Sequence, residues 1–328
     1  MKKIILIGMV ACLAAACGGE EKKLFQQAQL QASKGNYAQA IDTYSRLLKK
    51  NPKHGAALTN RGILWEQVAA KDAAEKQKNR EYAEQDYLKA IEVNPEQPET
   101  YNNLGALYLD TRQYAEAVYY FTQAMTYRPD YFTARMNRAI AYSNLGQFSS
   151  SLNDFSKAIE RHPNDPLVYL NRGLAYFNMS RYESAASDFS RVIALKPQDA
   201  RAYVERARAF IRLGYPSDAF ADLQEAVTLK PTYAIAYYYM GDLLFRKGDK
   251  EQAIGHLIRA KELASQYVPT YELMGDMLAL EDPVAATSNY MVAAKLDPAH
   301  AQHYQRKMEL LRTEEGREQI MTQRFFAR

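Results

Sequence analysis

The sequence has almost no cysteine. Of its 328 residues only Cys12 and Cys17 are cysteines, so the chain beyond residue 17 has no thiolate for a disulfide, a metal or nucleophilic catalysis. An excess of charge of one sign is lacking too, because 42 Lys and Arg stand against 38 Asp and Glu, a formal charge of +4. This balance does not favour nucleic-acid binding, and we expect no nucleic-acid partner.

Apolar runs long enough to cross a membrane are also lacking. Lys2 and Lys3 precede an apolar run from Ile4 to Ala16, which is shorter than the roughly 20 residues that a spanning helix needs. This arrangement predicts a secretory signal over residues 1–16. Its removal takes away both lysines and lowers the formal charge from +4 to +2.

The signal ends in Leu13-Ala14-Ala15-Ala16-Cys17, which resembles the lipobox of bacterial lipoproteins. The resemblance implies that Cys17 is lipidated, that residues 17–20 form a lipidated linker, and that the lipid holds the protein at a membrane of the cell envelope. Ala14 departs from the leucine common at its place. Cys12 is the weaker lipidation candidate, and an ordinary signal peptide is the alternative.

The residues after Cys17 bear on location. Gly18 is not the aspartate that retains many lipoproteins at the inner membrane of enteric bacteria, so the resemblance favours the outer membrane. The "GGEE" stretch also resembles an acidic signal that sends some lipoproteins to the cell surface. The periplasmic and surface sides both stay open.

What the chain does have is a repeat of 34 residues, clearest in 98–131, 132–165, 166–199 and 200–233. Each copy carries aromatic or apolar and small residues at spacings of three, four and seven, which predict two amphipathic helices joined by a turn. A proline near the end of each copy stops the second helix. In 166–199 the patterned residues are Tyr169, Gly173, Tyr176, Ala185, Phe189 and Val192.

This pattern resembles the tetratricopeptide repeat (TPR). The resemblance implies an all-α fold, an α-solenoid of about eight helix hairpins in a right-handed superhelix with a C-terminal capping helix. The predicted repeats are 21–54, 55–97, 98–131, 132–165, 166–199, 200–233, 234–267 and 268–300, followed by a capping helix and tail over 301–328. Repeat 55–97 holds nine extra residues, predicted to lengthen both helices, and the chain from Glu314 is predicted to be loosely ordered.

Arginine and aspartate co-occur in four repeats. Wherever Arg stands at position 7, Asp stands at position 23, and the four repeats without the Arg lack the Asp. We interpret these pairs as salt bridges within hairpins, although shared descent of the repeats would give the same pattern. The pairs are Arg61 with Asp86, Arg138 with Asp154, Arg172 with Asp188, and Arg206 with Asp222.

Asparagine occupies position 6 in four successive repeats, as Asn60, Asn103, Asn137 and Asn171. In TPR superhelices this position faces the concave groove, and the row resembles the asparagine ladder of O-linked N-acetylglucosamine transferase, which holds the backbone of an extended peptide. A carboxamide can both donate to and accept from a peptide unit. Four such pairings, at about 1 kcal/mol each, give only about millimolar affinity. The alternative is that the asparagines bond to neighbouring helices.

Side-chain anchors must therefore supply the remaining affinity. The resemblance places an apolar stretch in the groove, followed by basic and aromatic residues that suit acidic groups or a terminal carboxylate. The alternative is a solvated arginine face. The predicted anchors are Leu170, Leu174, Phe177, Arg201, Arg208, Arg212 and Tyr238.

The repeats fill residues 21–313 and leave no room for a catalytic domain, so we expect no enzyme, catalytic residue or cofactor. His300 and His303 lie close together but favour no metal site.

The leading hypothesis is a membrane-anchored adaptor or scaffold that binds an envelope protein or peptide segment in its groove. The alternative is a structural or regulatory subunit of an envelope assembly that uses hairpin tips such as 68–82, edges or the convex face. Outer-membrane lipoproteins with these repeats act in outer-membrane biogenesis, pilus biogenesis and cell-wall hydrolase control.

Overall fold

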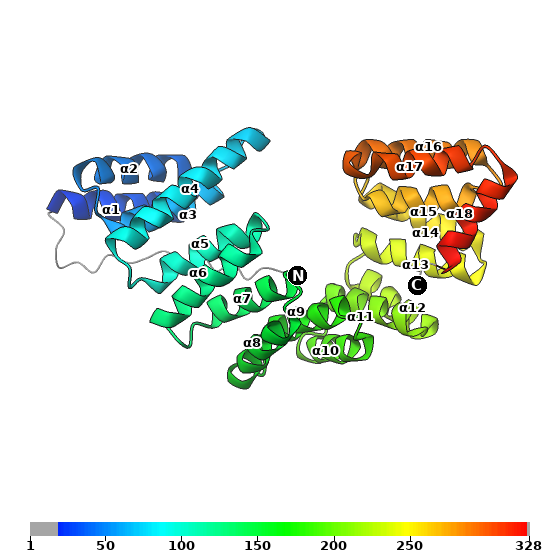
Figure 1. Ribbon diagram of the computed structural model, residues 1–328, viewed down its shortest axis with the longest axis horizontal. Coiled ribbons are helices and arrows are strands. Elements are labelled where there is room, and N and C mark those ends of the chain that lie inside the picture. The colour runs from blue at the N-terminus through cyan, green and yellow to red at the C-terminus, as the bar shows by residue number, and fades with distance from the viewer. Residues whose placement is uncertain (1–18, 327–328) are drawn as a thin grey trace. The chain divides into compact units, whose positions relative to one another are not determined.

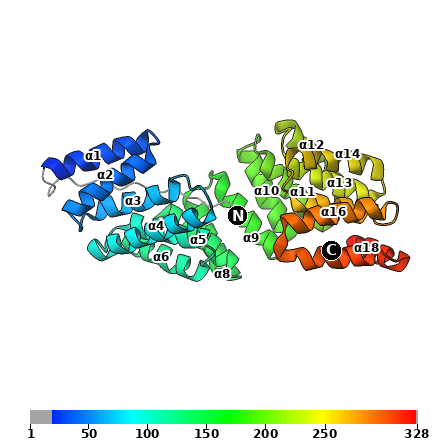
Figure 2. The ribbon, with the colours of Figure 1, turned by 90° about the horizontal axis from the view of Figure 1, so that it is seen from above.

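The computed structural model describes residues 19–326, and within this range the chain forms helices and no strand. Successive helices pack as hairpins (Figures 1 and 2), which confirms the predicted all-α solenoid of helix hairpins. The helices are α1 (Gly19–Ser33), α2 (Tyr37–Lys50), α3 (Gly55–Gln67), α4 (Ala73–Val93), α5 (Pro98–Asp110), α6 (Tyr114–Tyr127), α7 (Phe132–Asn144), α8 (Phe148–Arg161), α9 (Pro166–Asn178), α10 (Tyr182–Leu195), α11 (Ala200–Leu213), α12 (Pro216–Leu229), α13 (Ala234–Lys247), α14 (Lys250–Leu263), α15 (Val268–Leu278), α16 (Pro283–Leu296), the 3-10 helix η1 (Pro298–His300), α17 (Ala301–Leu310) and α18 (Glu314–Phe326).

The described chain divides into two compact units, and the division falls inside α9. The N-terminal unit ends at Asn171 and the C-terminal unit begins at Arg172. The odd-numbered helices α1 to α15 are the first helices of their hairpins. In the N-terminal unit α5 packs against α7, and in the C-terminal unit α13 packs against both α11 and α15. We call the surface that the first helices form within each unit its inner face.

Each hairpin closes around one large side chain of its second helix. The Phe189 side chain is completely buried, and a Cβ atom on Gly173 would lie only 2.7 Å from its ring. The missing side chain thus lets the ring lie directly on the first helix, and burying such a ring stabilises the fold by about 2 kcal/mol. The same contact joins Gly62 to Tyr87, Gly105 to Phe121, and Gly275 to Tyr290.

The turns inside six of the eight hairpins share one backbone conformation. Gly146 and Gly214 have φ of 73° and 79°, in the left-handed region that glycine adopts without strain. At the same place in other hairpins stand Arg112 and Ser180, with φ of 62° and 58°. These hairpins keep the left-handed conformation even where the sequence offers a side chain.

The nine extra residues of the second hairpin lengthen only one helix. Helix α4 has 21 residues, whereas α3 has 13, the same number as α5 and α7. The prediction that both helices are lengthened is therefore wrong for α3. Asp72 begins α4 because its carboxylate accepts a hydrogen bond from the Glu75 N–H at 2.8 Å.

The two ends of the described chain also differ from the predictions. Helix α1 begins at Gly19, inside the predicted linker 17–20. The prediction of loose order from Glu314 is wrong, because Glu314–Phe326 forms α18 and its Ile320 side chain is 1% exposed. The predicted signal peptide and Cys17 lie outside the described residues. Among the helices of 19–326, none combines the length and apolar character that crossing a bilayer requires.

Candidate functional site

The predicted arginine–aspartate pairs are confirmed and belong to the scaffold. Arg172 donates from Nε to Asp188 Oδ2 at 2.8 Å and from Nη2 to Oδ1 at 2.7 Å. Burial raises the pKa of the Asp188 carboxyl, and the Arg172 guanidinium opposes that rise. The same two-pronged geometry joins Arg61 to Asp86, Arg138 to Asp154, and Arg206 to Asp222.

These arginines also tie successive hairpins together. Arg206 Nη1 donates to Ser190 Oγ at 3.0 Å, and Ser190 lies on the second helix of the preceding hairpin. Arg61 makes the equivalent bond to Ser45 at 2.9 Å, and Arg138 to Thr122 at 3.0 Å. Sequence reasoning missed this contact, although a hydroxyl 16 residues before each of these arginines marks it.

The asparagine row is buried. All four predicted ladder residues are at 0% exposure, so the expectation that they line an open groove is corrected. Two of these side-chain amides make hydrogen bonds inside the fold. Asn60 Nδ2 lies 3.2 Å from the Tyr44 hydroxyl, and Asn171 Nδ2 donates to the Leu167 carbonyl at 2.9 Å. The four residues are Asn60, Asn103, Asn137 and Asn171, all in the N-terminal unit.

Asn103 differs from its equivalents. Its side-chain nitrogen and oxygen are both buried, and neither has a hydrogen-bond partner in the structure. Leaving a buried polar group unpaired costs about 1–3 kcal/mol. The unpaired Asn103 amide therefore lowers the stability of the fold, and a role in binding would explain why it is there.

The inner face of the C-terminal unit brings several predicted anchors together around Arg208. The Arg208 guanidinium lies 4.7 Å from the centroid of the Phe177 ring and 5.8 Å from that of Tyr239. Tyr239 in turn meets Tyr238, with ring centroids 5.1 Å apart. These residues come from α9, α11 and α13, so three successive first helices build one arginine and aromatic cluster.

The charges of this cluster are more balanced than the sequence suggested. Arg208 Nη1 donates to Glu205 Oε2 at 2.5 Å, and Arg201 Nε lies 3.6 Å from Glu205 Oε1. The expectation of a basic surface is therefore corrected, since two of its three arginines share one carboxylate. Burial alone would lower the pKa of Arg208, but Glu205 and Tyr239 raise it, so Arg208 stays charged. Its side chain is 30% exposed and can still meet a ligand.

The other predicted anchors lie outside the cluster. Leu170 and Leu174 are 1% and 8% exposed and belong to the core. Arg212 is exposed, and its guanidinium lies 5.1 Å from the Tyr182 ring centroid. Tyr267, which sequence reasoning did not place here, joins the cluster through Tyr238 at a centroid separation of 5.4 Å.

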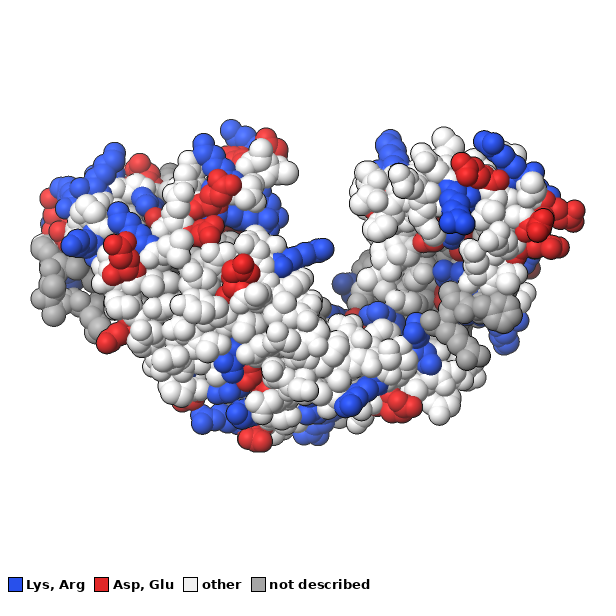
Figure 3. Space-filling model, in the orientation of Figure 1, with Lys and Arg blue, Asp and Glu red and all other residues white. Residues whose placement is uncertain are grey.

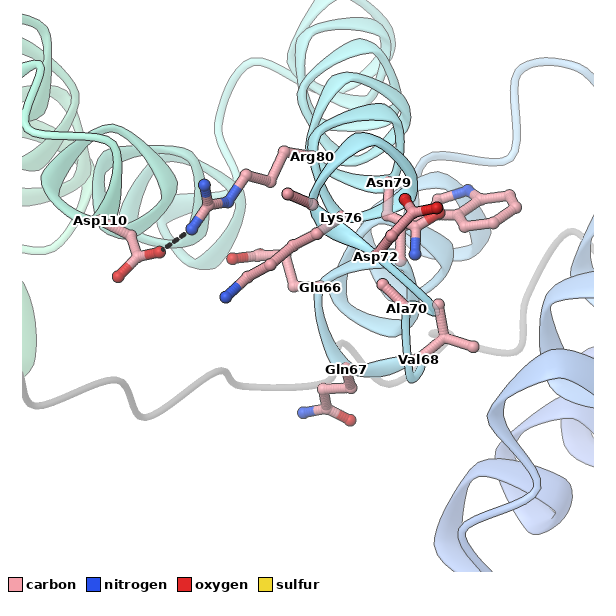
Figure 4. Close-up of a pocket in the computed structure, with 11 residues that line it drawn as sticks. Glu66, Gln67, Val68, Ala70, Asp72, Lys76, Asn79, Arg80 and Asp110 are labelled. Atoms are coloured by element: carbon pink, nitrogen blue, oxygen red, sulfur yellow. Dashed lines mark hydrogen bonds and ion pairs between the residues drawn. The ribbon is translucent and has the colours of Figure 1, made fainter. Parts of the chain in front are cut away.

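A cavity of about 550 Å³ lies at the tip of the second hairpin (Figure 4). Figure 4 shows Arg80 of α4 reaching toward Asp110 at the end of α5, and the two groups are 2.6 Å apart. Glu66 on another wall accepts a hydrogen bond from the Tyr87 hydroxyl at 2.6 Å. The walls carry charges of both signs, so the cavity shows no preference for one charged ligand. The nine-residue insertion thus creates a mixed-charge surface at the hairpin tip.

A surface with few charges lies over α5 and α6 of the N-terminal unit (Figure 3). Helix α6 has Glu116 as its only charged residue. Tyr119 and Tyr127 on this second helix are 57% and 41% exposed. This tyrosine-bearing surface lies away from the inner face.

Repeated helix hairpins tied by buried rings and arginine pairs define a helical repeat protein whose surfaces suit protein contacts. The chain belongs to the tetratricopeptide repeat family. One family model, described as tetratricopeptide repeat, matches residues 25–86, 136–200, 170–234 and 204–268, and a second matches 86–119. The architecture is that of a scaffold for protein–protein interaction.

The known proteins similar to this chain include the following three. Tetratricopeptide repeat protein 6 from Homo sapiens is 37% identical over 83 residues, which are 25% of this chain and 14% of that protein. A tetratricopeptide repeat protein from Parabacteroides merdae is 20% identical, with a TM-score of 0.64 over 78% of this chain and 98% of that one. PilW, a type IV pilus biogenesis factor, is 19% identical, with a TM-score of 0.57 over 66% and 96%. The two structures support the fold alone.

Proposed function

We propose that this protein is a non-catalytic adaptor that binds an extended segment of another protein on the inner face that its first helices form. The observation that carries this proposal is the cluster around Arg208 in the C-terminal unit. Its partly exposed arginine and aromatic groups stand on three successive first helices, α9, α11 and α13. Aromatic and arginine side chains are the groups that most often dominate protein interfaces.

The cluster favours a segment with an acidic group next to an apolar or aromatic side chain. Arg208 keeps its charge while its carboxylate partner Glu205 also serves Arg201. An incoming carboxylate would therefore find donors that Glu205 does not saturate. Phe177 and Tyr239 flank the same guanidinium and offer faces for apolar contact.

The asparagine row contributes to this proposal through Asn103. A peptide unit supplies the acceptor and the donor that the buried Asn103 amide lacks. Because Asn103 is at 0% exposure, a partner segment on the N-terminal unit reaches it only after α5 and its neighbours in that unit move apart. We therefore propose that binding opens this part of the inner face, rather than that an open ladder awaits the peptide.

Capture of partners from the source cells tests the adaptor proposal. Arg208→Glu reverses the charge at the centre of the cluster, whereas Arg259→Glu does so on the second helix α14, where the side chain is 48% exposed. We expect Arg208→Glu to lose at least one partner that the wild type and Arg259→Glu both recover. Recovery of the same partners by all three proteins, at matched melting temperatures, contradicts binding on the inner face.

The membrane anchor is a separate proposal that rests on the lipobox resemblance. We propose that Cys17 carries the lipid and that the protein sits at the outer membrane of the cell envelope. Metabolic labelling with a radioactive fatty acid tests it. Label should persist in Cys12→Ala and vanish in Cys17→Ala, and label in Cys17→Ala would overturn the assignment.

The second candidate function is a structural or regulatory subunit of an envelope assembly. The exposed Tyr119 and Tyr127 on the charge-poor surface of α6 favour it, because exposed tyrosines are frequent at protein interfaces. Tyr119→Glu should then release the assembly while Arg208→Glu leaves it intact. The opposite result favours the adaptor.

A further inference from the structure

The last helix of the chain returns onto the inner face of the C-terminal unit. Helix α18 follows the capping helix α17, yet it packs against α15, the first helix of the last hairpin (Figure 1). Ile320 is 1% exposed, and Met321 packs on the cluster that contains Leu244, Phe245 and Met274. A helix that only covered the end of the solenoid would have no reason to reach residues of α13.

The polar end of α18 reaches further back. Arg324 Nη2 donates to Asp242 Oδ1 at 2.5 Å, and Asp242 lies on α13, 82 residues earlier in the chain. The Asp242 side chain is 8% exposed and also accepts from Arg246 Nε at 3.1 Å. Arg324 thus pairs with a buried carboxylate next to Tyr238, which is one of the predicted groove residues.

The inner positions around α18 are acidic, and cations from the chain's C-terminal segment neutralise them. Lys307 Nζ of α17 lies 2.7 Å from both Glu272 Oε1 and Asp276 Oδ1 on α15. Arg324 supplies the corresponding charge to Asp242. Without α18, this part of the inner face would present Asp242, held by Arg246 alone, beside exposed apolar side chains.

The attachment of α18 is narrow. Only one side of the helix contacts the solenoid, and its other residues, Glu314, Glu315, Glu318, Gln319, Thr322 and Gln323, are exposed. A 13-residue helix is marginal on its own in water, so α18 depends on this surface for its own structure. Gly316 is a further constraint, since a Cβ there would lie 2.2 Å from the Leu310 carbonyl oxygen.

We propose that α18 is a displaceable occupant of the inner face formed by α13 and α15, and that a protein segment with two adjacent apolar residues followed by an arginine three positions later binds there in its place. This inference rests on the proposed adaptor function and deepens it: the Arg208 cluster takes the acidic group of the partner segment, and the neighbouring surface around Asp242 takes an arginine of the same segment. The spacing of Ile320, Met321 and Arg324 defines what the surface accepts. The C-terminal segment then controls access to the partner site, because a partner must compete with α18.

A peptide of residues 314–326, labelled with a fluorophore and titrated with the purified protein, tests this inference by fluorescence anisotropy. The wild type should bind the peptide weakly because its own α18 fills the surface. Gly316→Ala should detach α18 without a change of charge and bind the peptide at least tenfold more tightly. Arg324→Glu should also detach α18, because it places a second carboxylate beside Asp242, and should give a similar gain in peptide affinity. This variant replaces Gly316→Ala if that change lowers solubility. Arg312→Glu changes an exposed charge in the same segment and should match the wild type.

The gain must depend on Asp242. Gly316→Ala combined with Asp242→Asn should lose most of it, and so should a peptide with glutamate in place of Arg324. Equal affinity of wild type and both detached variants, or a gain unaffected by Asp242→Asn, overturns the inference. The peptide probe comes from the chain itself, so this experiment gives an answer even if the capture experiment finds no partner. The two proposals can therefore fail separately.

Discussion

Arg172 grips both carboxylate oxygens of Asp188, at 2.8 and 2.7 Å, across the two helices of one hairpin. The Asp188 side chain is 7% exposed and the Arg172 side chain 20%, so the pair is shielded from most solvent screening. The same pair recurs in three other hairpins, which makes it a repeated element of the scaffold rather than part of a binding site.

Breaking this pair from one side should cost more than removing it altogether. Arg172→Leu leaves a buried carboxylate without its cation and should cost about 3 kcal/mol. The double variant Arg172→Leu with Asp188→Leu should cost clearly less than the two single changes summed. Urea denaturation of the four proteins measures the coupling, and simple additivity would contradict an interacting pair.

Two asparagines of the buried row should respond oppositely to the same substitution. Asn103→Leu removes an amide with no hydrogen-bond partner and should stabilise the protein by about 1 kcal/mol. Asn60→Leu removes the contact to Tyr44 and should destabilise by a similar amount. Thermal melting of both variants provides the comparison. A loss at Asn103 as large as that at Asn60 would mean that Asn103 also supports the fold.

The strained turn of the fifth hairpin offers a stabilising change. Ser180 has φ of 58°, where a side chain is strained, so Ser180→Gly should raise stability by about 1 kcal/mol. Gly146 occupies the equivalent position with φ of 73°, and Gly146→Ser should lower stability by a comparable amount. Denaturant midpoints test both, and a destabilised Ser180→Gly variant would refute the strain.

Acid should weaken the second hairpin through His54. His54 Nδ1 accepts a hydrogen bond from the Ala57 N–H at 3.1 Å and thereby caps α3, and burial lowers the pKa of His54 below its ordinary 6.5. The folded state binds this proton less readily than the unfolded chain, so stability is full above pH 6.5 and declines as the pH falls toward the lowered pKa. Protonation removes the cap acceptor, a loss of about 1 kcal/mol.

Melting temperatures between pH 7.5 and 5.0 check this expectation. His54→Asn keeps a capping side chain without a titrating group and should make the fall in melting temperature smaller. Part of the fall should remain, because burial also lowers the pKa of His256. His300→Asn changes a side chain that is 71% exposed and serves as the control. A decline in His54→Asn as steep as in the wild type would exclude His54 as its source.

The hairpins and their arginine pairs could be predicted because they repeat. A period of 34 residues brings Arg172 and Asp188 to the same relative place as three other pairs, so co-occurrence reveals the contact. The burial of Asn103 could not be predicted in this way, because exposure depends on how closely neighbouring first helices pack. The position of α18 could not be predicted from the repeats either. Its ion pair between Arg324 and Asp242 spans 82 residues and has no equivalent in another repeat, so no co-occurrence pattern indicates it.

Photo-crosslinking in cells tests the central claim, that partners bind the inner face. A photoreactive phenylalanine analogue would replace Arg212, which is exposed on the first helix α11, or Tyr119, which is 57% exposed on the second helix α6. The adaptor proposal predicts a partner crosslinked from position 212 and none from position 119. Crosslinks from position 119 alone would contradict it and assign the contacts to the outer surface.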